Sequence, residues 1–124
     1  MLIFKTRWFY KWAAKEGIAD DALLAAVDEL NAGLLDADLG GHVIKKRLGL
    51  RGRGKRGGIR VLVTFRREDK VFFIYGFVKN ERANISAKEL TALKLLASEL
   101  LRYTGAILAR AVAAEELIEV RSDV

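Results

Sequence analysis

The spacing of apolar residues changes along the chain from strand-like to helix-like and back. The run 1–5 (MLIFK) is apolar and β-branched, and it predicts an opening strand. From Trp8 to Ala13 the apolar residues recur at helical spacing, and Gly17 supplies a stop, so a helix is predicted to follow at once. Trp8 and Trp12 in this helix suggest stacking on nucleic-acid bases. An apolar stripe of this kind is more typical of packing on a protein core, and we favour packing.

A second helix is predicted to begin at Asp20, which suits the N-cap position. Its predicted apolar face consists of Leu23, Leu24, Val27, Leu30, Leu34 and Leu35. The segment 36–41 (DADLGG) is rich in aspartate and glycine and predicts a loop. Two aspartates are too few to predict a metal site, so we assign them to turn chemistry.

Apolar runs between residues 43 and 78 predict neighbouring strands. In 43–48 (VIKKRL), alternation places Lys45 and Arg47 on one face, although it does not decide which face is buried. The segment 50–58 (LRGRGKRGG) is predicted to be a glycine-rich, cationic hairpin connection. It lacks the Lys-Ser/Thr ending of a phosphate-binding loop and precedes a strand. We therefore expect a clamp on backbone phosphates or a solvated loop.

The runs that follow are more regular. Residues 59–67 alternate, with Ile59, Val61, Val63 and Phe65 predicted on one face and Arg60, Leu62, Thr64 and Arg66 on the other. A turn at 68–70 leads to 71–78 (VFFIYGFV), which is apolar enough to predict a central strand covered on both faces. Gly76 within it predicts a bulge or the close approach of another element.

Ser86 and Glu89 have the spacing of a capping box, which predicts the start of a third helix. Its predicted apolar stripe consists of Leu90, Leu93, Leu96, Ala97, Leu100 and Leu101. Residues 106–113 predict a short helix, and 117–120 (LIEV) a terminal strand or docked tail. No repeat or linker divides the chain, so residues 1–124 are predicted to form one α+β domain. In it a small antiparallel meander sheet packs against N-terminal helices, with a C-terminal helix.

Positive charge is concentrated on the predicted sheet. Residues 45–84 hold 13 of the 22 Lys and Arg but only 3 of the 16 acids, a local net charge of +10 in a chain of +6. The remaining segments are therefore mildly acidic. A folded sheet with this charge predicts shaped recognition of a polyanion, such as a nucleic acid.

The composition also excludes several kinds of site. The chain has no cysteine and one histidine, so it offers no disulfide, no thiol nucleophile and no His-ligated metal centre. No apolar run reaches the ~20 residues that span a bilayer, and the N-terminus lacks a signal-peptide pattern. We therefore expect a soluble cytoplasmic protein without a metal or other cofactor.

The order of these elements resembles that of a known protein superfamily. Two helices, a meander containing GGIRV and VFFIYGFVKNERANIS, and a closing helix resemble the RelE/ParE superfamily of bacterial toxins from toxin-antitoxin pairs, in particular its RelE-type, HigB-like branch. The matching motifs are the arginine of the middle strand and Lys-x-Glu-Arg after the last strand. The resemblance covers about residues 1–103, which leaves about 104–124 as a C-terminal extension.

The resemblance implies an activity and partners. A toxin of this kind is an endoribonuclease that cuts messenger RNA in the ribosomal A site, inhibits translation and needs no metal. The ribose 2′-OH attacks the adjacent phosphorus and leaves a 2′,3′-cyclic phosphate and a 5′-OH. The implied partners are the ribosome, mRNA and a cognate antitoxin, commonly a helix-turn-helix DNA-binding protein. An acidic amphipathic segment of the antitoxin would suit the basic sheet and mask the site.

The resemblance also implies roles for residues. Arg60 matches the strand arginine that stabilises charge on the phosphorane, and Lys45 and Arg47 resemble the paired cations of the preceding strand. Lys79 and Arg82 match the cluster after the last strand. The predicted catalytic residues are therefore Arg60, Lys79, Arg82 and Lys45. The predicted RNA-binding residues are Arg47, Arg53, Lys55 and Arg56.

The general base does not follow from the resemblance. Asn80 stands where the best-known members have an arginine, and residues 85–86 (Ile-Ser) stand where they have a tyrosine or histidine base. Cations close together lower each other's pKa, so Lys45 and Lys79 are candidate bases. Glu81 is a rival candidate, although we favour a role as an ion-pair partner of neighbouring cations.

Two other functions remain open at this point. The ParE branch of the same superfamily acts on DNA gyrase, and a fold alone does not fix a function. The missing tyrosine or histidine base is compatible with a nucleic-acid-binding module that performs no catalysis. The density of cations on the strands favours RNA cleavage over gyrase inhibition.

Overall fold

The computed structural model describes residues 1–50 and 54–121, together with the side chains of these residues except 50 and 54–57. The elements, in chain order, are β1 Leu2–Thr6, α1 Arg7–Glu16, α2 Asp20–Asn31, β2 Ala37–Asp38, β3 Ile44–Leu50, β4 Gly54–Arg66, β5 Lys70–Val78, α3 Ala87–Leu101, α4 Gly105–Ala113 and β6 Leu117–Glu119. The opening strand, the two N-terminal helices, the C-terminal helices and the terminal strand are thus confirmed.

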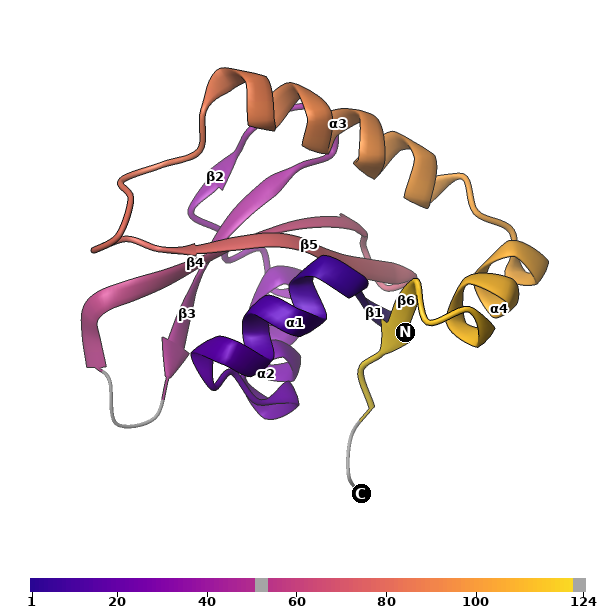
Figure 1. Cartoon of the computed structure of the whole chain (residues 1–124), viewed down its shortest axis with the longest axis horizontal. Coiled ribbons are helices and arrows are strands. Elements are labelled where there is room, and N and C mark those ends of the chain that lie inside the picture. Colours follow the sequence, from indigo (N-terminus) through magenta and orange to yellow (C-terminus); the bar gives the residue numbers. More distant parts are fainter. Residues whose placement is uncertain (51–53, 122–124) are drawn as a thin grey trace.

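The strands form one sheet in the order β2-β3-β4-β5-β1-β6. β3, β4 and β5 are consecutive antiparallel neighbours, which confirms the meander. β1 lies parallel to β5, and β6 pairs antiparallel with β1 at the edge. Helices cover both faces, α1 and α2 on one side and α3 on the other, and α4 lies beside β6 (Figure 1). The α+β fold class is confirmed, with a larger sheet than the sequence predicted.

Two hydrophobic cores lie on opposite faces of the sheet, and the alternation along β4 decides which residues enter each. Ile59, Val61 and Val63 are buried under α1 and α2, with Phe65 packed against them. Leu62 is buried on the α3 side. The two faces predicted from the period-two pattern are therefore confirmed.

β5 is the central, doubly covered strand that the sequence predicted. It also contains a β-bulge, at a position that the sequence did not indicate. Leu62 pairs with Tyr75 and Val63 with Phe73, which leaves Ile74 as an extra residue on β5. Ile74 and Tyr75 consequently both belong to the α3-side core. The bulge turns the following residues over, so that Gly76 faces α1.

Gly76 marks a close approach, as predicted. A Cβ atom at this position would lie 2.1 Å from Cζ3 of Trp12. Trp12 packs on the core, as expected, whereas Trp8 is 45% exposed and stacks on the ring of Tyr75 with a centroid separation of 4.4 Å. Trp12 can reach the strand only because residue 76 has no side chain.

Two predictions about α2 are wrong. Ala19 is its N-cap and Asp20 its first residue, and the Asp20 carboxylate instead accepts a hydrogen bond from the buried Nζ of Lys5 at 2.7 Å. The helix also ends at Asn31, so Leu34 and Leu35 leave its apolar face and are 57% and 38% exposed. Gly33, with φ of 86°, makes the turn that separates them from the helix.

Parts of the two glycine-containing segments that were predicted to be loops form strands. Within 36–41, residues 37–38 form β2 and pair with β3, while Asp38 accepts a hydrogen bond from the backbone N–H of Gly40, which is the expected turn chemistry. In the predicted connection 50–58, residues 54–58 already belong to β4. Residues 51–53 lie outside the described part of the chain.

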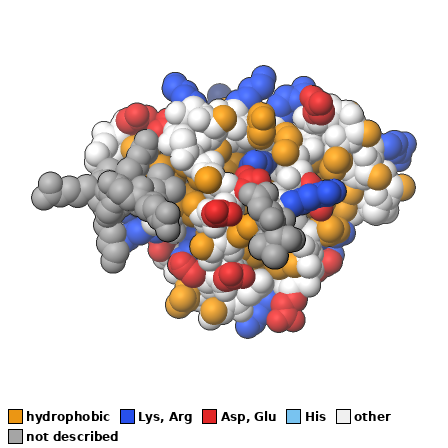
Figure 2. Space-filling model, turned by 90° about the horizontal axis from the view of Figure 1, so that it is seen from below, with side chains coloured by type: hydrophobic (Ala, Val, Ile, Leu, Met, Phe, Trp, Pro, Cys, Tyr) orange, Lys and Arg blue, Asp and Glu red, His pale blue; other side chains and the backbone are white. Residues whose placement is uncertain are grey.

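The third helix begins as predicted. Ser86 and Glu89 form both hydrogen bonds of the capping box, and all six residues of the predicted stripe contribute to the α3-side core. Figure 2 shows acidic side chains gathered between apolar ones on the side opposite α3, in agreement with the mildly acidic helices. Among the described residues, none of the helices has the length and apolar character needed to cross a membrane.

Candidate active site

A cleft of about 470 Å³ lies over β3, β4 and the end of β5 that leads into α3. Its lining consists of Leu35, Asp36, Ala37, Lys45, Arg47, Arg60, Phe77, Lys79 and Ala83. Four cations and one carboxylate therefore share a single concavity. Three of the four predicted catalytic residues and one of the predicted RNA-binding residues are brought together here.

Strand register places the cations side by side. Arg47 pairs with Arg60, and Arg60 pairs with Phe77 across the next ladder, so all three side chains lie on one face. Lys45 lies two residues before Arg47 on the same face. The backbone N–H of Lys79 donates to the carbonyl of Gly58 at 2.9 Å, which holds the start of the following turn against β4. Positive charge is thus focused by a rigid sheet.

Arg60 is the most deeply placed cation of the cleft. Its side chain is 11% exposed, and its Nη1 is buried without a hydrogen-bond partner among the described residues. Its Nε lies 4.0 Å from Oδ2 of Asp36, an ion-pair distance beyond hydrogen-bond range. A buried, unsatisfied guanidinium N–H is costly, so Arg60 has a hydrogen-bond donor that no described residue uses. The planar fork of arginine suits a phosphate in this position.

Arg82, the fourth predicted catalytic residue, does not line the cleft. Its guanidinium is 6.0 Å from the centroid of Phe77, but it donates hydrogen bonds to the Glu89 carboxylate and, at 3.2 Å, to the hydroxyl of Tyr75. The ion-pair partner of this cation is therefore Glu89. Glu81, which the sequence suggested for such a role, lies exposed in the turn after β5.

Glu89 ties the loop between β5 and α3 to the helix. Its carboxylate accepts hydrogen bonds from Arg82, from the backbone N–H of Ser86 and, at 3.1 Å, from the hydroxyl of Tyr75. The hydrogen bond from Arg82, followed by that from Ser86, holds the pKa of Glu89 well below its usual range. Burial and then the hydrogen bond to Glu89 raise the pKa of Tyr75, which therefore stays protonated.

This cluster predicts a dependence of stability on pH. A carboxyl whose pKa is lower in the folded chain than in the unfolded chain stabilises the fold above the unfolded value, here about 4.5, and this stabilisation is lost as the pH falls below it. We expect wild type to exceed Glu89→Gln in free energy of unfolding by a constant amount above pH 6, and the difference to shrink below pH 4.5. Urea unfolding at a series of pH values measures it. Glu81→Gln is the matched control, and a Glu89→Gln difference that stays constant down to pH 3 would contradict the assignment.

The remaining predicted RNA-binding residues are placed only in part. Arg47 is exposed at the cleft. Arg53 lies outside the described residues. Lys55 and Arg56 are part of strand β4, of which the structure describes only the backbone at these two positions. Lys46, within the same cationic stretch, points away from the cleft and is buried, with its Nζ 3.0 Å from Glu29. Lys46 therefore adds to the charge count of this stretch but not to the positive charge of the cleft.

Asp36 and Phe77 line the cleft beside Arg60, although the sequence analysis gave neither a role in the site. Asp36 was assigned to turn chemistry, and its proximity to Arg60 depends on β2 pairing with β3, which a two-residue strand does not signal in advance. Phe77 was placed on an apolar central strand without a role. Its ring is 4% exposed and lines the cleft beside Arg60.

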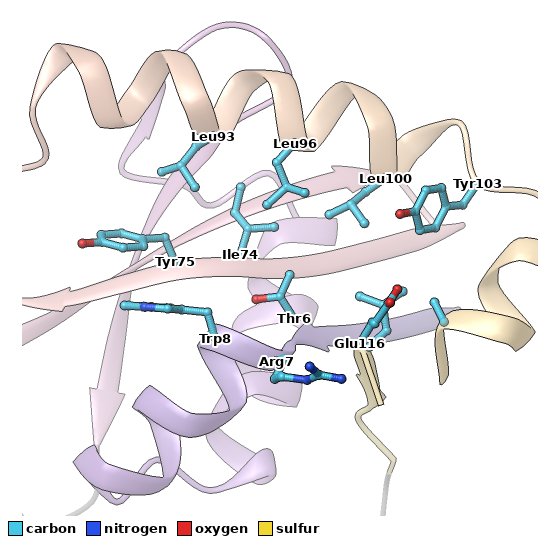
Figure 3. A pocket seen from close by; sticks show the side chains of 12 residues that line it. Thr6, Arg7, Trp8, Ile74, Tyr75, Leu93, Leu96, Leu100, Tyr103 and Glu116 are labelled. Atoms are coloured by element: carbon cyan, nitrogen blue, oxygen red, sulfur yellow. The ribbon is translucent and has the colours of Figure 1, made fainter. Parts of the chain in front are cut away.

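A second concavity, of about 440 Å³, has Tyr75 in its lining and is mainly apolar. Leu93, Leu96 and Leu100 of α3 point into it from above, and Trp8 lies under the ring of Tyr75 at one end (Figure 3). Tyr75 lines this apolar groove and is absent from the lining of the cationic cleft.

The chain also matches a known protein family. A model of the family described as the RelE toxin of the RelE/RelB toxin-antitoxin system matches residues 1–120. The match extends past residue 103, where the sequence resemblance ended, and includes α4 and β6. No curated protein matches the chain. Since the family match spans nearly the whole chain, the protein belongs to the RelE toxin family.

Proposed function

We propose that this toxin is a ribosome-dependent mRNA endoribonuclease that inhibits translation in the cytoplasm. Membership of the RelE family supports a toxin of a toxin-antitoxin pair. The observation that carries the finer proposal is the buried, unpartnered Nη1 of Arg60 in a cleft with Lys45, Arg47 and Lys79. Such an arrangement fits an RNA phosphate.

The proposed roles follow from charge and reach. Transphosphorylation needs charge neutralised on the equatorial oxygens and a proton delivered to the departing 5′ oxygen. Arg60 bridges the equatorial oxygens, since arginine keeps its charge and presents parallel N–H donors. Lys45 and Lys79 carry transferable protons for the leaving oxygen, and Arg47 binds a neighbouring backbone phosphate. Arg82 acts at a distance, because its pairing with Glu89 fixes the loop that begins at Lys79.

We propose that the ribosome takes part because the reaction needs a precise alignment of the RNA strand. Positioning two reacting atoms can contribute several kcal/mol to catalysis. A cleft of cations alone does not align a flexible RNA strand, so we propose that the A site holds the 2′ oxygen in line with the bond that breaks.

The antitoxin is the second partner that the family implies. We propose that it is a helix-turn-helix DNA-binding protein whose acidic amphipathic segment crosses the basic sheet and covers the cleft. The cationic cleft and the adjacent apolar groove suit the two sides of such a segment.

Primer extension on translating mRNA tests the proposed function. Adding purified protein is expected to produce new 5′ ends within the reading frame, only when ribosomes occupy the transcript. Intact transcripts together with inhibited gyrase supercoiling would place the chain with the gyrase inhibitors. Intact transcripts with salt-dependent RNA binding would indicate a binding module without catalysis.

A further inference from the structure

We propose that Asp36 is the general base of this site, a role that rests on the proposed function. Among the described residues that line the cleft, Asp36 is the one carboxylate, and it shares the cleft with Lys45, Arg47, Arg60 and Lys79. Neither the charge pattern of the strands nor the positions where relatives carry a base points to it.

The backbone holds Asp36 at the edge of the sheet. Its N–H donates to the carbonyl of Lys45 at 3.0 Å, and the next two residues form β2 against β3. The side chain is 31% exposed. Among the described residues, the carboxylate accepts no hydrogen bond, since its nearest cation, Nε of Arg60, is 4.0 Å away. The backbone of Asp36 is therefore held in place, while its carboxylate oxygens are open to a proton.

The position beside Arg60 is the one that a base requires. A phosphate bound by the Arg60 guanidinium lies next to the Asp36 carboxylate, and the attacking 2′ oxygen belongs to the ribose attached to that phosphate. A base has to be within hydrogen-bond reach of the proton it removes. The 4.0 Å gap between Oδ2 and Nε leaves the carboxylate within reach of a group bound at Arg60 without a strong ion pair that would occupy it.

The other candidates fit less well. Lys45 and Lys79 lie in the same cleft and have the role of proton donors to the leaving oxygen in the proposed reaction. Glu81 is exposed in a turn and does not line the cleft. Glu89 is saturated with donors, and those donors lower its pKa, which makes it a poor acceptor.

The proton and electron balance is complete with residues of the cleft. The Asp36 carboxylate takes the proton of the 2′-OH while the 2′ oxygen forms a bond to phosphorus. The bond from phosphorus to the 5′ oxygen breaks, and that oxygen takes a proton from the ammonium of Lys45 or Lys79. The products are a 2′,3′-cyclic phosphate and a 5′-OH, with Asp36 protonated and one lysine neutral until both exchange with water.

The test uses single-turnover cleavage of mRNA on programmed ribosomes. Asp36→Ala is expected to lower the maximal rate by about 100- to 10,000-fold, the usual contribution of a general base, with little change in the concentration for half-saturation. Asp36→Glu is expected to retain part of the rate. Glu81→Gln removes a nearby carboxylate outside the cleft and is expected to retain the wild-type rate.

Added imidazole separates a base from a partner that merely orients Arg60. Neutral imidazole can remove a proton but cannot replace a negative charge, so it is expected to restore cleavage by Asp36→Ala in proportion to its concentration. Rescue by formate but not by imidazole, or no rescue at all, would overturn the assignment. An unchanged rate for Asp36→Ala, with cleavage by wild type, contradicts only the base. Intact mRNA with wild type contradicts the proposed function and the base with it.

Discussion

Arg60→Ala is expected to lower the rate of mRNA cleavage by about 100- to 1,000-fold while leaving the protein folded. The size follows from removing one preorganised donor to developing negative charge. The side chain is almost buried, and its Nη1 lacks a partner in the described structure, so little of its interaction energy stabilises the fold. Removing a buried cation that lies among Lys45, Arg47 and Lys79 also relieves repulsion. We therefore expect the free energy of unfolding to stay constant or rise.

Arg66→Ala is the matched control for this prediction. Arg66 lies on the same strand and the same face as Arg60, but its side chain is 57% exposed and contacts Asp69 and the carbonyl of Leu101 away from the cleft. It removes the same charge and is expected to keep most of the activity. Single-turnover cleavage and urea unfolding measure both variants. Arg60→Ala with wild-type cleavage, or with lost activity only because the chain unfolds, would remove Arg60 from the proposed mechanism.

Gly76→Ala is expected to destabilise the fold by about 1–3 kcal/mol, the usual cost of overpacking a core. The added Cβ would lie 2.1 Å from Cζ3 and 2.3 Å from Cη2 of Trp12, so either the indole or the strand has to move. Trp12 also packs against Phe9, at a centroid distance of 5.4 Å, and stacks on Trp8. A displaced indole therefore disturbs the whole contact between α1 and β5.

Gly49→Ala is the matched control, because a Cβ atom at Gly49 of β3 would meet nothing within 4 Å. It is expected to change stability by less than about 0.5 kcal/mol. Urea unfolding measures both alanine variants. Together with Trp12→Leu alone and Gly76→Ala combined with Trp12→Leu, it gives the coupling energy between positions 12 and 76. Equal stabilities for the two alanine variants, or additive effects of Gly76→Ala and Trp12→Leu, would show that the close approach is not what requires glycine.

Features that depend on residues close together in the sequence could be predicted, whereas features that depend on contacts between distant segments could not. Alternation along β4 predicted both faces of the sheet because each face is buried under helices. The capping box of Ser86 and Glu89 was predictable because its partners are three residues apart. Gly76 predicted a bulge or a close approach in β5, but nothing in this uniformly apolar strand indicated that the extra residue is Ile74.

The candidate site likewise contains residues that the sequence predicted and contacts that depend on tertiary structure. Arg60, Lys45 and Lys79 were predicted because charge stands out on apolar strands and because the family resemblance names their positions. The pairing of Arg82 with Glu89 joins a loop to a helix seven residues on, and that contact depends on the path of the chain between them. Asp36 reaches Arg60 only through the edge strand β2, so its place in the cleft is a result of tertiary structure.

The most direct test of the proposed reaction replaces the 2′-hydroxyl group of one substrate ribose by hydrogen. Programmed ribosomes would carry mRNA with either a ribose or a 2′-deoxyribose at the mapped cleavage position, and the ends produced by the purified protein would be analysed chemically. The account predicts that the ribose strand is cut to a 2′,3′-cyclic phosphate and a 5′-OH and that the deoxy strand stays whole. Cleavage of both strands at equal rates would contradict it, because attack by the neighbouring 2′ oxygen would then not be the reaction.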